Sequence, residues 1–426
     1  MLFTAEEYEA RLARVRARMA DQGLRALIVT DPANIYYLTA YNAWSFYTPQ
    51  MLFVPYQGDM VFFAREMDAN GAFRTSWLPE SCIEPYPEAY VHRADIHPFD
   101  WIAQRLRRRK LIAPTTGVVG LEMDSNFFTA KSYRALVNAV PEWTLVDSFE
   151  LVNWVRAVKS EAEIVLMRKA ATITTAAMEA ARETIAVGVI QAEVASAISA
   201  VQFRGAGELA GDYPAIVPMM PTGEAADTPH LTWSGQRFER DQIVIIELGG
   251  VYKRYHVPLA RTFTTGAASE NVRYLAEAVD TSLQAMIETI ASGVAVSELA
   301  QAWNRSLFTF GLTKESRLGY SIGVGYPPDW GERTISIRTE DETVLEPNMT
   351  FHLIAGMWMD GYGYECSEPV RVTADGVELF TDLPRGVTST LGSSADSGSN
   401  PGTSPVSNSS PGPVSSPIAP ITAESA

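Results

Sequence analysis

Histidine and glutamate side chains in two short stretches could carry out acid/base chemistry. His230 lies in the polar sequence Asp227-Thr228-Pro229-His230, and Glu247 follows it by seventeen residues, directly after the apolar run Ile243–Ile246. An imidazole titrates near neutral pH and suits proton transfer at that pH. A histidine that is only hydrogen-bonded in a loop is the alternative for His230.

Glu247 is predicted to be buried, because it follows an apolar strand. A buried carboxylate is costly unless a cation or hydrogen-bond donors compensate it. The cation could be a substrate that carries an amidinium or guanidinium group. The alternative is a structural ion pair with Arg254 or Arg261.

Two further stretches carry charged groups of interest. Glu365 and Glu368 lie in the sequence Tyr364-Glu365-Cys366-Ser367-Glu368-Pro369, and the sequence does not show which of the two points inward. Arg338 ends the run Thr334-Ile335-Ser336-Ile337-Arg338. A guanidinium fork is well suited to hold a carboxylate, although an isolated arginine more often forms a surface ion pair.

The elements that position these residues are predicted from apolar periodicity. The first 150 residues alternate strand-like and helical patterns and are predicted to form an α/β domain. Ser160-Glu161-Ala162-Glu163 is a capping box that opens a long helix. Helices are then expected at 160–184, 191–203, 270–290 and 296–310, and strands near 243–247, 349–354 and 369–372. The order of helix pair and strands occurs twice, which suggests an internal pseudo-duplication.

Composition excludes several classes of partner. The chain has 426 residues and a formal net charge of −16, which argues against nucleic acid and anionic membranes. Its two cysteines, Cys82 and Cys366, are far apart and predict no disulfide. We find no signal peptide and no apolar run of membrane-spanning length, so a cytoplasmic location is expected. From about residue 388 onward, Ser, Pro, Gly and Ala dominate, and we expect a disordered tail.

The segments around Glu247 resemble those that carry the metal ligands in pita-bread metallopeptidases. In that family two aspartates stand eleven residues apart, and here these positions are Glu247 and Pro258. The three remaining ligand positions, placed from flanking motifs, are Tyr320, Ile354 and Ser367, with Glu368 as the neighbour of the last. A two-metal site needs several carboxylates. The resemblance therefore implies the fold without its metals, and neither a metal nor another cofactor is expected.

Creatinase, a metal-free member of the same family, has its catalytic histidine at the spacing that His230 keeps from Glu247. The resemblance implies that His230 is the general base and later the proton donor, and that Arg338 holds a substrate carboxylate. The catalytic glutamate of creatinase is replaced by Ala260, which makes creatine an improbable substrate.

Several motifs resemble those of the ectoine hydrolases, which open a cyclic amidine. Among them are Gly211-Asp212-Tyr213-Pro214 and Tyr326-Pro327-Pro328-Asp329-Trp330-Gly331-Glu332-Arg333, and the similarity spans roughly residues 5–385. We expect Trp44, Phe46, Tyr326 and Trp330 to enclose a planar cation. Each of these rings alone is more often part of a core. The full set of expected substrate-binding residues is Arg338, Tyr320, Tyr326, Trp330, Trp44, Phe46, His256 and His352, and that of catalytic residues is His230, Glu247, Glu365 and Glu368.

The sequence thus predicts a pita-bread α/β domain at residues 151–387, a smaller creatinase-type α/β domain at 1–150, and a tail at 388–426. The expected activity is metal-independent hydrolysis of a non-peptide C–N bond, in particular the opening of ectoine to an N-acetyl-2,4-diaminobutyrate. A homodimer is implied by the resemblance. The alternatives are a metal-dependent Xaa-Pro dipeptidase and a non-catalytic protein that binds a small molecule in the same pocket.

Overall fold

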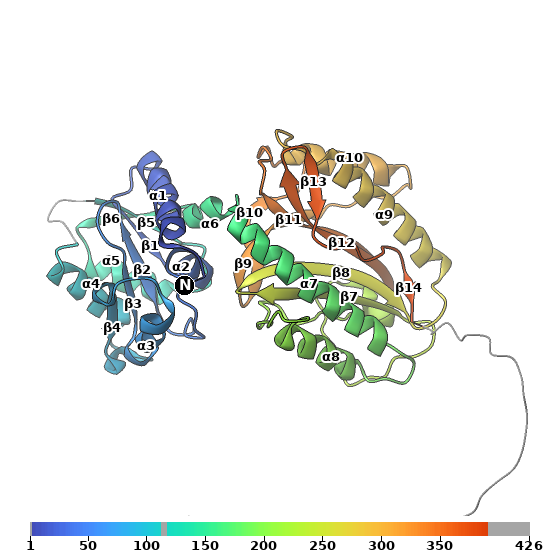
Figure 1. Ribbon diagram of the computed structural model, residues 1–426, viewed down its shortest axis with the longest axis horizontal. Helices are drawn as coiled ribbons and strands as arrows, with labels where there is room; N and C mark the ends of the chain where they lie inside the picture. The colour runs from blue at the N-terminus through green and yellow to red at the C-terminus, as the bar shows by residue number, and fades with distance from the viewer. Residues whose placement is uncertain (1, 112–116, 391–426) are drawn as a thin grey trace, which may run out of the picture. The chain divides into compact units, whose positions relative to one another are not determined.

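The N-terminal part of the chain is built on a six-stranded sheet, shown in blue and teal in Figure 1. The computed structural model describes residues 2–111 and 117–390. The strands are ordered β4-β3-β2-β1-β5-β6. Their bounds are β1 Ala26–Val29, β2 Met51–Pro55, β3 Val61–Arg65, β4 Ile83–Tyr86, β5 Gly117–Leu121 and β6 Trp143–Asp147. The expected α/β domain is therefore present.

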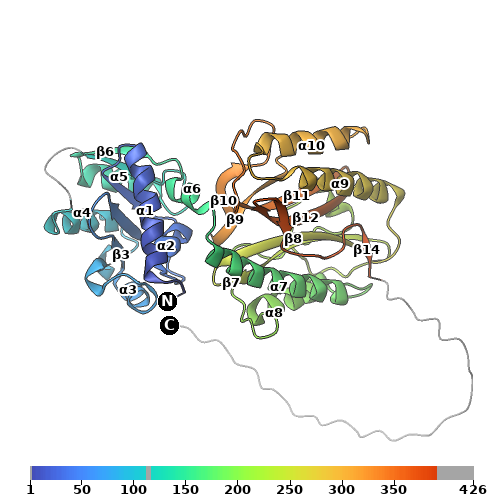
Figure 2. The same ribbon diagram turned by 45° about the horizontal axis from the view of Figure 1, so that its top comes forward.

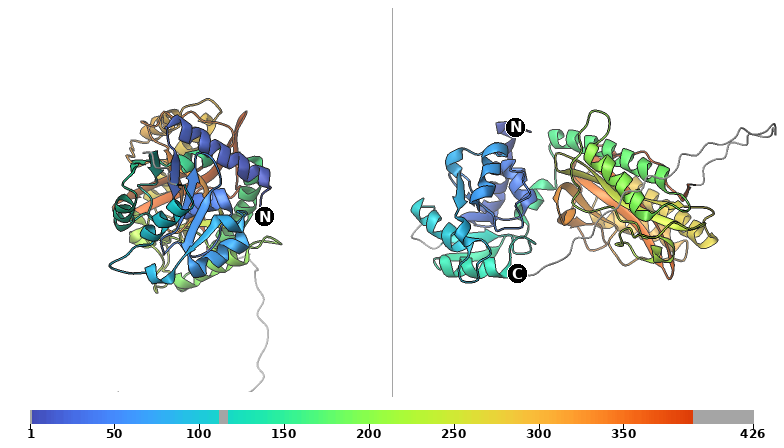
Figure 3. Two further views of the ribbon diagram at one scale, coloured as in Figure 1. Left: turned by 90° about the vertical axis from the view of Figure 1, so that its left-hand side faces the viewer. Right: turned by 90° about the horizontal axis from the view of Figure 1, so that it is seen from below.

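Helices cover this sheet, and the short helix α6 leads from it into the C-terminal part of the chain. Their bounds are α1 Ala5–Asp21, α2 Pro32–Thr39, α3 Glu66–Thr75, α4 Pro98–Arg108, α5 Ala130–Ala139 and α6 Leu151–Arg156, with short 3-10 turns at Glu80–Cys82 and Glu88–Tyr90. Figure 3 shows the sheet and its helices from another side. Strands β1 and β2 are buried at every position, so both faces of the sheet are covered there.

The C-terminal part contains a second, strongly antiparallel sheet with the order β13-β12-β11-β9-β8-β14, in which β10 pairs with β9 and β7 with β8. The strands are β7 Ile243–Tyr252, β8 Tyr255–Thr264, β9 Gly319–Tyr326, β10 Asp329–Ser336, β11 Thr350–Met359, β12 Tyr362–Thr373, β13 Gly376–Leu379 and β14 Thr388–Ser389. The helices are α7 Glu161–Thr184, α8 Gln191–Arg204, α9 Glu270–Thr289 and α10 Val296–Phe308, with a 3-10 turn at Gly223–Asp227.

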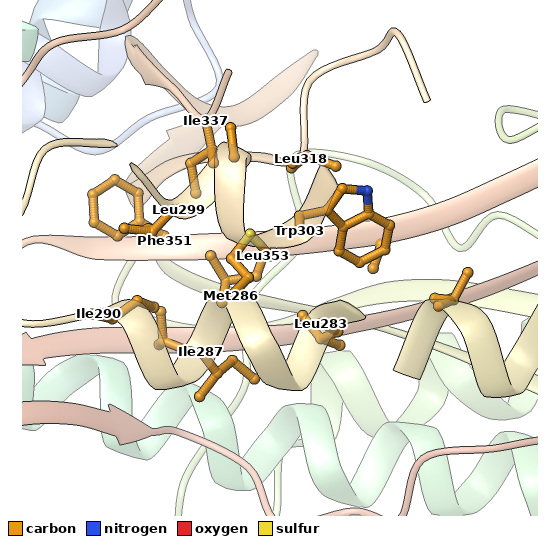
Figure 4. Packing of buried hydrophobic residues seen from close by; sticks show 14 of the residues in the cluster. Leu283, Met286, Ile287, Ile290, Leu299, Trp303, Leu318, Ile337, Phe351 and Leu353 are labelled. Carbon is orange, nitrogen blue, oxygen red and sulfur yellow. The ribbon is translucent and has the colours of Figure 1, made fainter. Parts of the chain in front are cut away.

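The predicted repetition of helix pair and strands is present, and each helix pair covers its own strands. Figure 2 shows α7 with α8 and α9 with α10 as two separate pairs. One core lies between α7, α8 and strands β7 and β8. Another lies between α9, α10 and strands β11 and β12, where Trp303 and Phe351 are fully buried (Figure 4). The helices occupy the outer face of the sheet, so the opposite, inner face is available to polar side chains.

The capping box at the start of α7 has the predicted geometry. The Ser160 hydroxyl accepts a hydrogen bond from the Glu163 backbone N–H at 3.3 Å, and the Glu163 carboxylate accepts one from the Ser160 N–H at 3.0 Å. Both bonds satisfy N–H groups that have no partner within the helix.

The end of the folded region differs slightly from the expectation. The tail was expected to begin at residue 388, whereas Thr388 and Ser389 form β14 and pair with Phe263 and Thr264 of β8. The remainder of the expected tail, residues 391–426, lies outside the described residues. Among the helices at 2–111 and 117–390, none is long and apolar enough to cross a membrane.

Candidate active site

Polar side chains from four strands meet on the inner face of the C-terminal sheet. Glu247 lies on β7, Tyr320 on β9, His352 on β11 and Glu365 on β12. Register brings them together, because His352 pairs directly with Tyr320. All four side chains are at most 8% exposed. We refer to this group as the inner-face cluster.

A line of hydrogen bonds crosses the inner-face cluster. The Trp330 indole N–H donates to the Tyr320 hydroxyl oxygen at 2.8 Å, and that hydroxyl lies 3.1 Å from His352 Nδ1. His352 Nε2 shares a second bond of 2.7 Å with the Ser367 hydroxyl, which also accepts the Ala260 backbone N–H at 2.6 Å. The line holds the rings of Tyr320 and His352 in fixed orientations.

His352 is neutral at neutral pH in this environment, and burial makes it a weak base. Burial, with smaller effects of the Arg317 and Arg261 charges, lowers the pKa of His352 to about 3. Burial also raises the pKa of Tyr320 well above its usual value, and the charge of Glu247 adds to this effect. His352 Nδ1 lies 4.0 Å from Glu247 Oε1, too far for a hydrogen bond.

Glu247 and Glu365 form the acidic part of the cluster. Burial raises the pKa of Glu247 to about 7, and the charge of Asp329 adds to the effect. Burial also raises the pKa of Glu365 well above 4.5, and here the charge of Glu247 adds to it. Both carboxylate oxygens of Glu365 are buried without a hydrogen-bond partner among the described residues. Such a pair is suited to share a proton or to receive a cation.

Glu368 belongs to a different environment from Glu365. Side chains alternate along β12, so that Glu365 and Ser367 point to one face and Glu368 to the other. Glu368 Oε1 accepts hydrogen bonds from Arg261 at 3.0 Å and from Arg385 at 2.8 Å. The structure therefore brings Glu365 together with Glu247 and does not bring Glu368 there. The alternative structural partner of Glu247, Arg261, is also engaged elsewhere.

Arg254, the other expected partner of Glu247, is likewise bound to different groups. Its guanidinium donates to the backbone oxygens of Tyr213 at 2.6 Å and Gly325 at 2.8 Å. It also lies 4.5 Å above the centre of the Tyr326 ring. Neither arginine forms an ion pair with Glu247 in the described part of the chain, and this acid remains uncompensated.

His230 is exposed, in a loop whose backbone runs beside Glu247. Met219 exchanges backbone hydrogen bonds with Glu247, at 2.9 and 3.2 Å, and the next residue, Met220, donates to Leu231 O at 2.8 Å. The backbone of His230 therefore lies close to β7. Its side chain is exposed and is not one of the buried groups of the inner-face cluster.

Arg338 is also exposed, and it follows β10 at the edge of the cluster. Its neighbour Ile337 is hydrogen-bonded to Leu318 and Gly319 through the backbone, at 2.9 Å in both cases. The backbone of Arg338 thus lies next to that of Arg317. The guanidinium carbon of Arg317 lies 4.4 Å above the centre of the Tyr320 ring. Sequence reasoning did not consider Arg317, because it stands in an irregular loop.

The expected aromatic enclosure is divided. Trp330 is completely buried, and its indole N–H donates to the Tyr320 hydroxyl of the cluster. Tyr326 is buried and donates to Asn42 Oδ1 at 2.7 Å. Phe46 packs against Tyr326, and Trp44, which is 57% exposed, packs against Phe46. Of the rings predicted from sequence to enclose a cation, Trp330 and Tyr326 are thus buried, whereas Trp44 is exposed.

His256 has a structural environment. Its Nδ1 bonds to the Arg254 backbone oxygen and its Nε2 accepts the Ala215 N–H, both at 2.9 Å. Burial, together with the Arg254 charge, lowers the pKa of His256 well below its usual value. Both ring nitrogens are occupied, which leaves none for a substrate.

Two further residues near Glu365 were missed by sequence reasoning. Lys314, in the loop before β9, donates to Gly356 O at 2.7 Å, and Gly356 is the strand partner of Glu365. Trp358 lies on the same strand as Gly356, and the Lys314 ammonium is 4.6 Å from its ring centre. No sequence pattern marks either residue, since their proximity depends on strand register and on the path of one loop.

The five positions that would hold two metals do not fit a metal centre. Of Glu247, Pro258, Tyr320, Ile354 and Ser367, one has a carboxylate. Within 2–111 and 117–390, no group of three or more His, Cys, Asp or Glu side chains is arranged to bind a metal ion. Glu365 adds a second carboxylate, which is fewer than a two-metal site requires.

A separate cavity of about 1000 Å³ lies on the other side of β12. It is lined by Glu368, Arg385, and residues of α7 and the segment after β13. None of Glu247, His352 and Glu365 lines it, so its size does not make it part of the candidate active site.

Comparison with known proteins identifies the family. Residues 165–374 match metallopeptidase family M24, and residues 11–158 match the creatinase/prolidase N-terminal domain. The ectoine hydrolase of Halomonas elongata is 40% identical over 389 residues, which cover 90% of this chain and 97% of that protein. The uncharacterised hydrolase/peptidase y4tM of Sinorhizobium fredii is 42% identical over 384 residues, with 90% and 97% covered.

More distant relatives share the whole architecture. The Xaa-Pro dipeptidase of Pyrococcus furiosus is 23% identical over 380 residues, which cover 88% of this chain and 98% of that protein. The solved prolidase of Thermococcus sibiricus superimposes with a TM-score of 0.78 at 18% identity and covers 90% of this chain and 99% of its own. From these matches and the two-part fold, the chain belongs to metallopeptidase family M24, in the group that carries a creatinase/prolidase N-terminal domain.

Proposed function

We propose that this protein is a metal-independent hydrolase that opens the cyclic amidine ectoine to an N-acetyl-2,4-diaminobutyrate. The observation that carries the proposal is the buried pair Glu247 and Glu365, which lies beside the positions that the resemblance assigns to metal ligands and forms no ion pair with an arginine or lysine among the described residues. The 40% identity to an ectoine hydrolase supports a hydrolase that acts on this kind of C–N bond.

A cationic substrate would compensate this acidic pair. An amidinium carries a delocalised positive charge and N–H groups that match carboxylate oxygens. Bound between Glu247 and Glu365, it would stabilise the ionised forms of these acids, whose pKa values burial raises. Because an amidinium carbon is already electrophilic, the site does not need a metal ion to polarise it.

The proposed reaction needs one water and three proton transfers. The water oxygen bonds to the amidine carbon while a base takes a proton from the water. The bond between that carbon and one ring nitrogen then breaks, and an acid gives this nitrogen a proton. The hydroxyl group on the carbon loses its remaining proton to the released amine, so the carbon becomes the acetyl amide carbonyl and the nitrogen leaves as an ammonium group. Glu247, with a pKa of about 7, is suited to exchange protons at neutral pH.

His230 and Arg338 have roles in the proposal that rest on the resemblance to creatinase. His230 would take the proton from water and return it to the leaving nitrogen, which requires its loop to bring the ring inward. The backbone bonds between Met219 and Glu247 keep that loop beside the site. Arg338 would help to hold the substrate carboxylate from the exposed rim, next to Arg317.

The proposal includes a homodimer and a cytoplasmic location. In this arrangement the exposed Trp44 and the partly buried Phe46 of one protomer would help to close the site of its partner. Sedimentation velocity measurement of the mass in solution tests the dimer directly.

The main alternative is a metal-dependent Xaa-Pro dipeptidase. Relatives of that name are more distant, at 23% identity, and the ligand positions occupied by proline and isoleucine disfavour it. A non-catalytic binding protein is the second alternative. Mass spectrometry of purified protein incubated with ectoine or a Xaa-Pro dipeptide, each with and without added manganese, separates the three. Formation of the acetylated product without metal supports the proposal. Hydrolysis of the dipeptide only, or of neither compound, would contradict it.

A further inference from the structure

We propose that Lys314 and Trp358 are specificity-determining residues that bind an anionic group of the substrate, so that the site selects zwitterionic amidines over amidines without a carboxylate. This inference rests on the proposed function and adds the buried contacts that distinguish one amidine from another.

The first observation is a shared contact point at Gly356. A Cβ atom at this position would lie 2.6 Å from Cζ2 and Cη2 of Trp358 and 3.2 Å from Cγ of Glu365. The indole and the glutamate side chain therefore approach the same point on the inner face. Glycine is needed here because any side chain would displace one of the two groups.

The second observation is a set of buried polar atoms without partners. Trp358 Nε1 is buried and unbonded among the described residues, as are both carboxylate oxygens of Glu365. A buried group without a hydrogen bond is costly, and native proteins rarely leave one unexplained. The Trp358 N–H is a hydrogen-bond donor and the Glu365 oxygens are acceptors. Together they suit a ligand that offers an acceptor to Trp358 and N–H donors to Glu365.

The third observation is the position of the Lys314 ammonium. It lies over the Trp358 ring and uses one of its three N–H groups on Gly356 O, at 2.7 Å. Burial lowers the pKa of Lys314 to about 8, and the charge of Glu365 opposes this shift. Lys314 is therefore mainly positive at neutral pH, and its ammonium has two further N–H groups to donate.

These groups form a site with two poles. The negative pole, Glu247 and Glu365, suits an amidinium, and the positive pole, Lys314 with Trp358, suits a carboxylate. A small ring that carries both charges would offer partners to Trp358 Nε1 and to both carboxylate oxygens of Glu365. A substrate that lacks the carboxylate leaves the Trp358 N–H and the Lys314 charge uncompensated, which is a strong basis for rejection.

The test compares ectoine with the methyltetrahydropyrimidine that lacks the carboxylate, in steady-state kinetics of wild type, Lys314→Met, Lys314→Arg and Trp358→Phe. We expect Lys314→Met and Trp358→Phe to lower kcat/KM for ectoine by about 10- to 100-fold, mainly through KM, since a binding contact is lost. The analogue should change less than about threefold. Lys314→Arg should keep most of the preference for ectoine. Lys169→Met, which removes a lysine 5.2 Å from the Tyr252 ring, is the matched control and should behave as wild type.

Equal losses for both compounds in Lys314→Met would overturn the inference, because Lys314 would then act only as a counter-ion of Glu365. An unchanged preference in both Lys314→Met and Trp358→Phe would also overturn it. Failure of the proposed function is recognised separately, because the wild-type protein then converts neither amidine. The inference is wrong in that case too.

Discussion

We predict that mutation of Glu247, one of the two acids of the inner-face cluster, increases the stability of the folded protein. Burial raises the pKa of Glu247 from 4.5 to about 7, so the folded protein holds this proton more tightly than the unfolded chain does. The stability contributed by Glu247 is therefore greatest at low pH and decreases as the pH rises from about 4.5 towards about 7. Glu247→Gln removes the titrating group and should abolish this loss.

The magnitude follows from the shift of the pKa. A difference between 4.5 and about 7 corresponds to about 3 kcal/mol at pH 8, at roughly 1.4 kcal/mol per pKa unit. At pH 5 the same group costs about 1 kcal/mol or less, because the folded state is still protonated and pH 5 lies only about half a unit above the unfolded pKa of 4.5. For a chain of this size, the pH 8 gain corresponds to a rise in Tm of about 2–4 °C.

The assay is thermal unfolding of wild type and Glu247→Gln between pH 5 and pH 9 without substrate. Glu368→Gln is the matched control, since Glu368 is equally buried but pairs with Arg261 and Arg385. It should lower the stability at pH 8 by roughly 2–4 kcal/mol, because two buried or half-buried cations lose their partner. A Tm difference between wild type and Glu247→Gln that is constant over this pH range, or a variant less stable than wild type at pH 8, would refute the reasoning.

Three further predictions concern the proposed activity. His230→Ala should lower kcat for ectoine by roughly 10²–10⁴-fold with a smaller change in KM, and a folded variant with wild-type kcat would remove His230 from the mechanism. Arg338→Ala should instead raise KM with little change in kcat, since a carboxylate contact is similar in the ground and transition states; a selective fall in kcat would contradict this role. Dialysis against a chelator should leave turnover unchanged, and recovery of lost activity by manganese, cobalt or zinc would show that the proposal of metal independence is wrong.

Much of the fold was predictable from local sequence. The capping box at Ser160 fixes the start of α7, and the apolar periodicity of α9 and α10 predicts both helices, because these signals act over a few residues. The resemblance to pita-bread metallopeptidases, which rests on local motifs, was sufficient to predict the family M24 fold. It also assigns four metal-ligand positions to Pro258, Tyr320, Ile354 and Ser367, on which the proposal of metal independence depends.

The composition of the site was decided by tertiary structure. Glu365 and Glu368 are three residues apart, and only the strand register shows that one faces Glu247 and the other faces Arg261. Trp330 was expected to line the pocket, and the fold shows in addition that its indole N–H donates to the Tyr320 hydroxyl.

Lys314 and Trp358 give the clearest example of what local sequence does not contain. They are 44 residues apart in the chain, and their contact depends on the loop before β9 crossing the end of β11. Residue type and short-range periodicity determined which elements this chain forms. Long-range register and side-chain burial decided which charges meet, because the energy of a buried charge depends on neighbours that are distant in sequence.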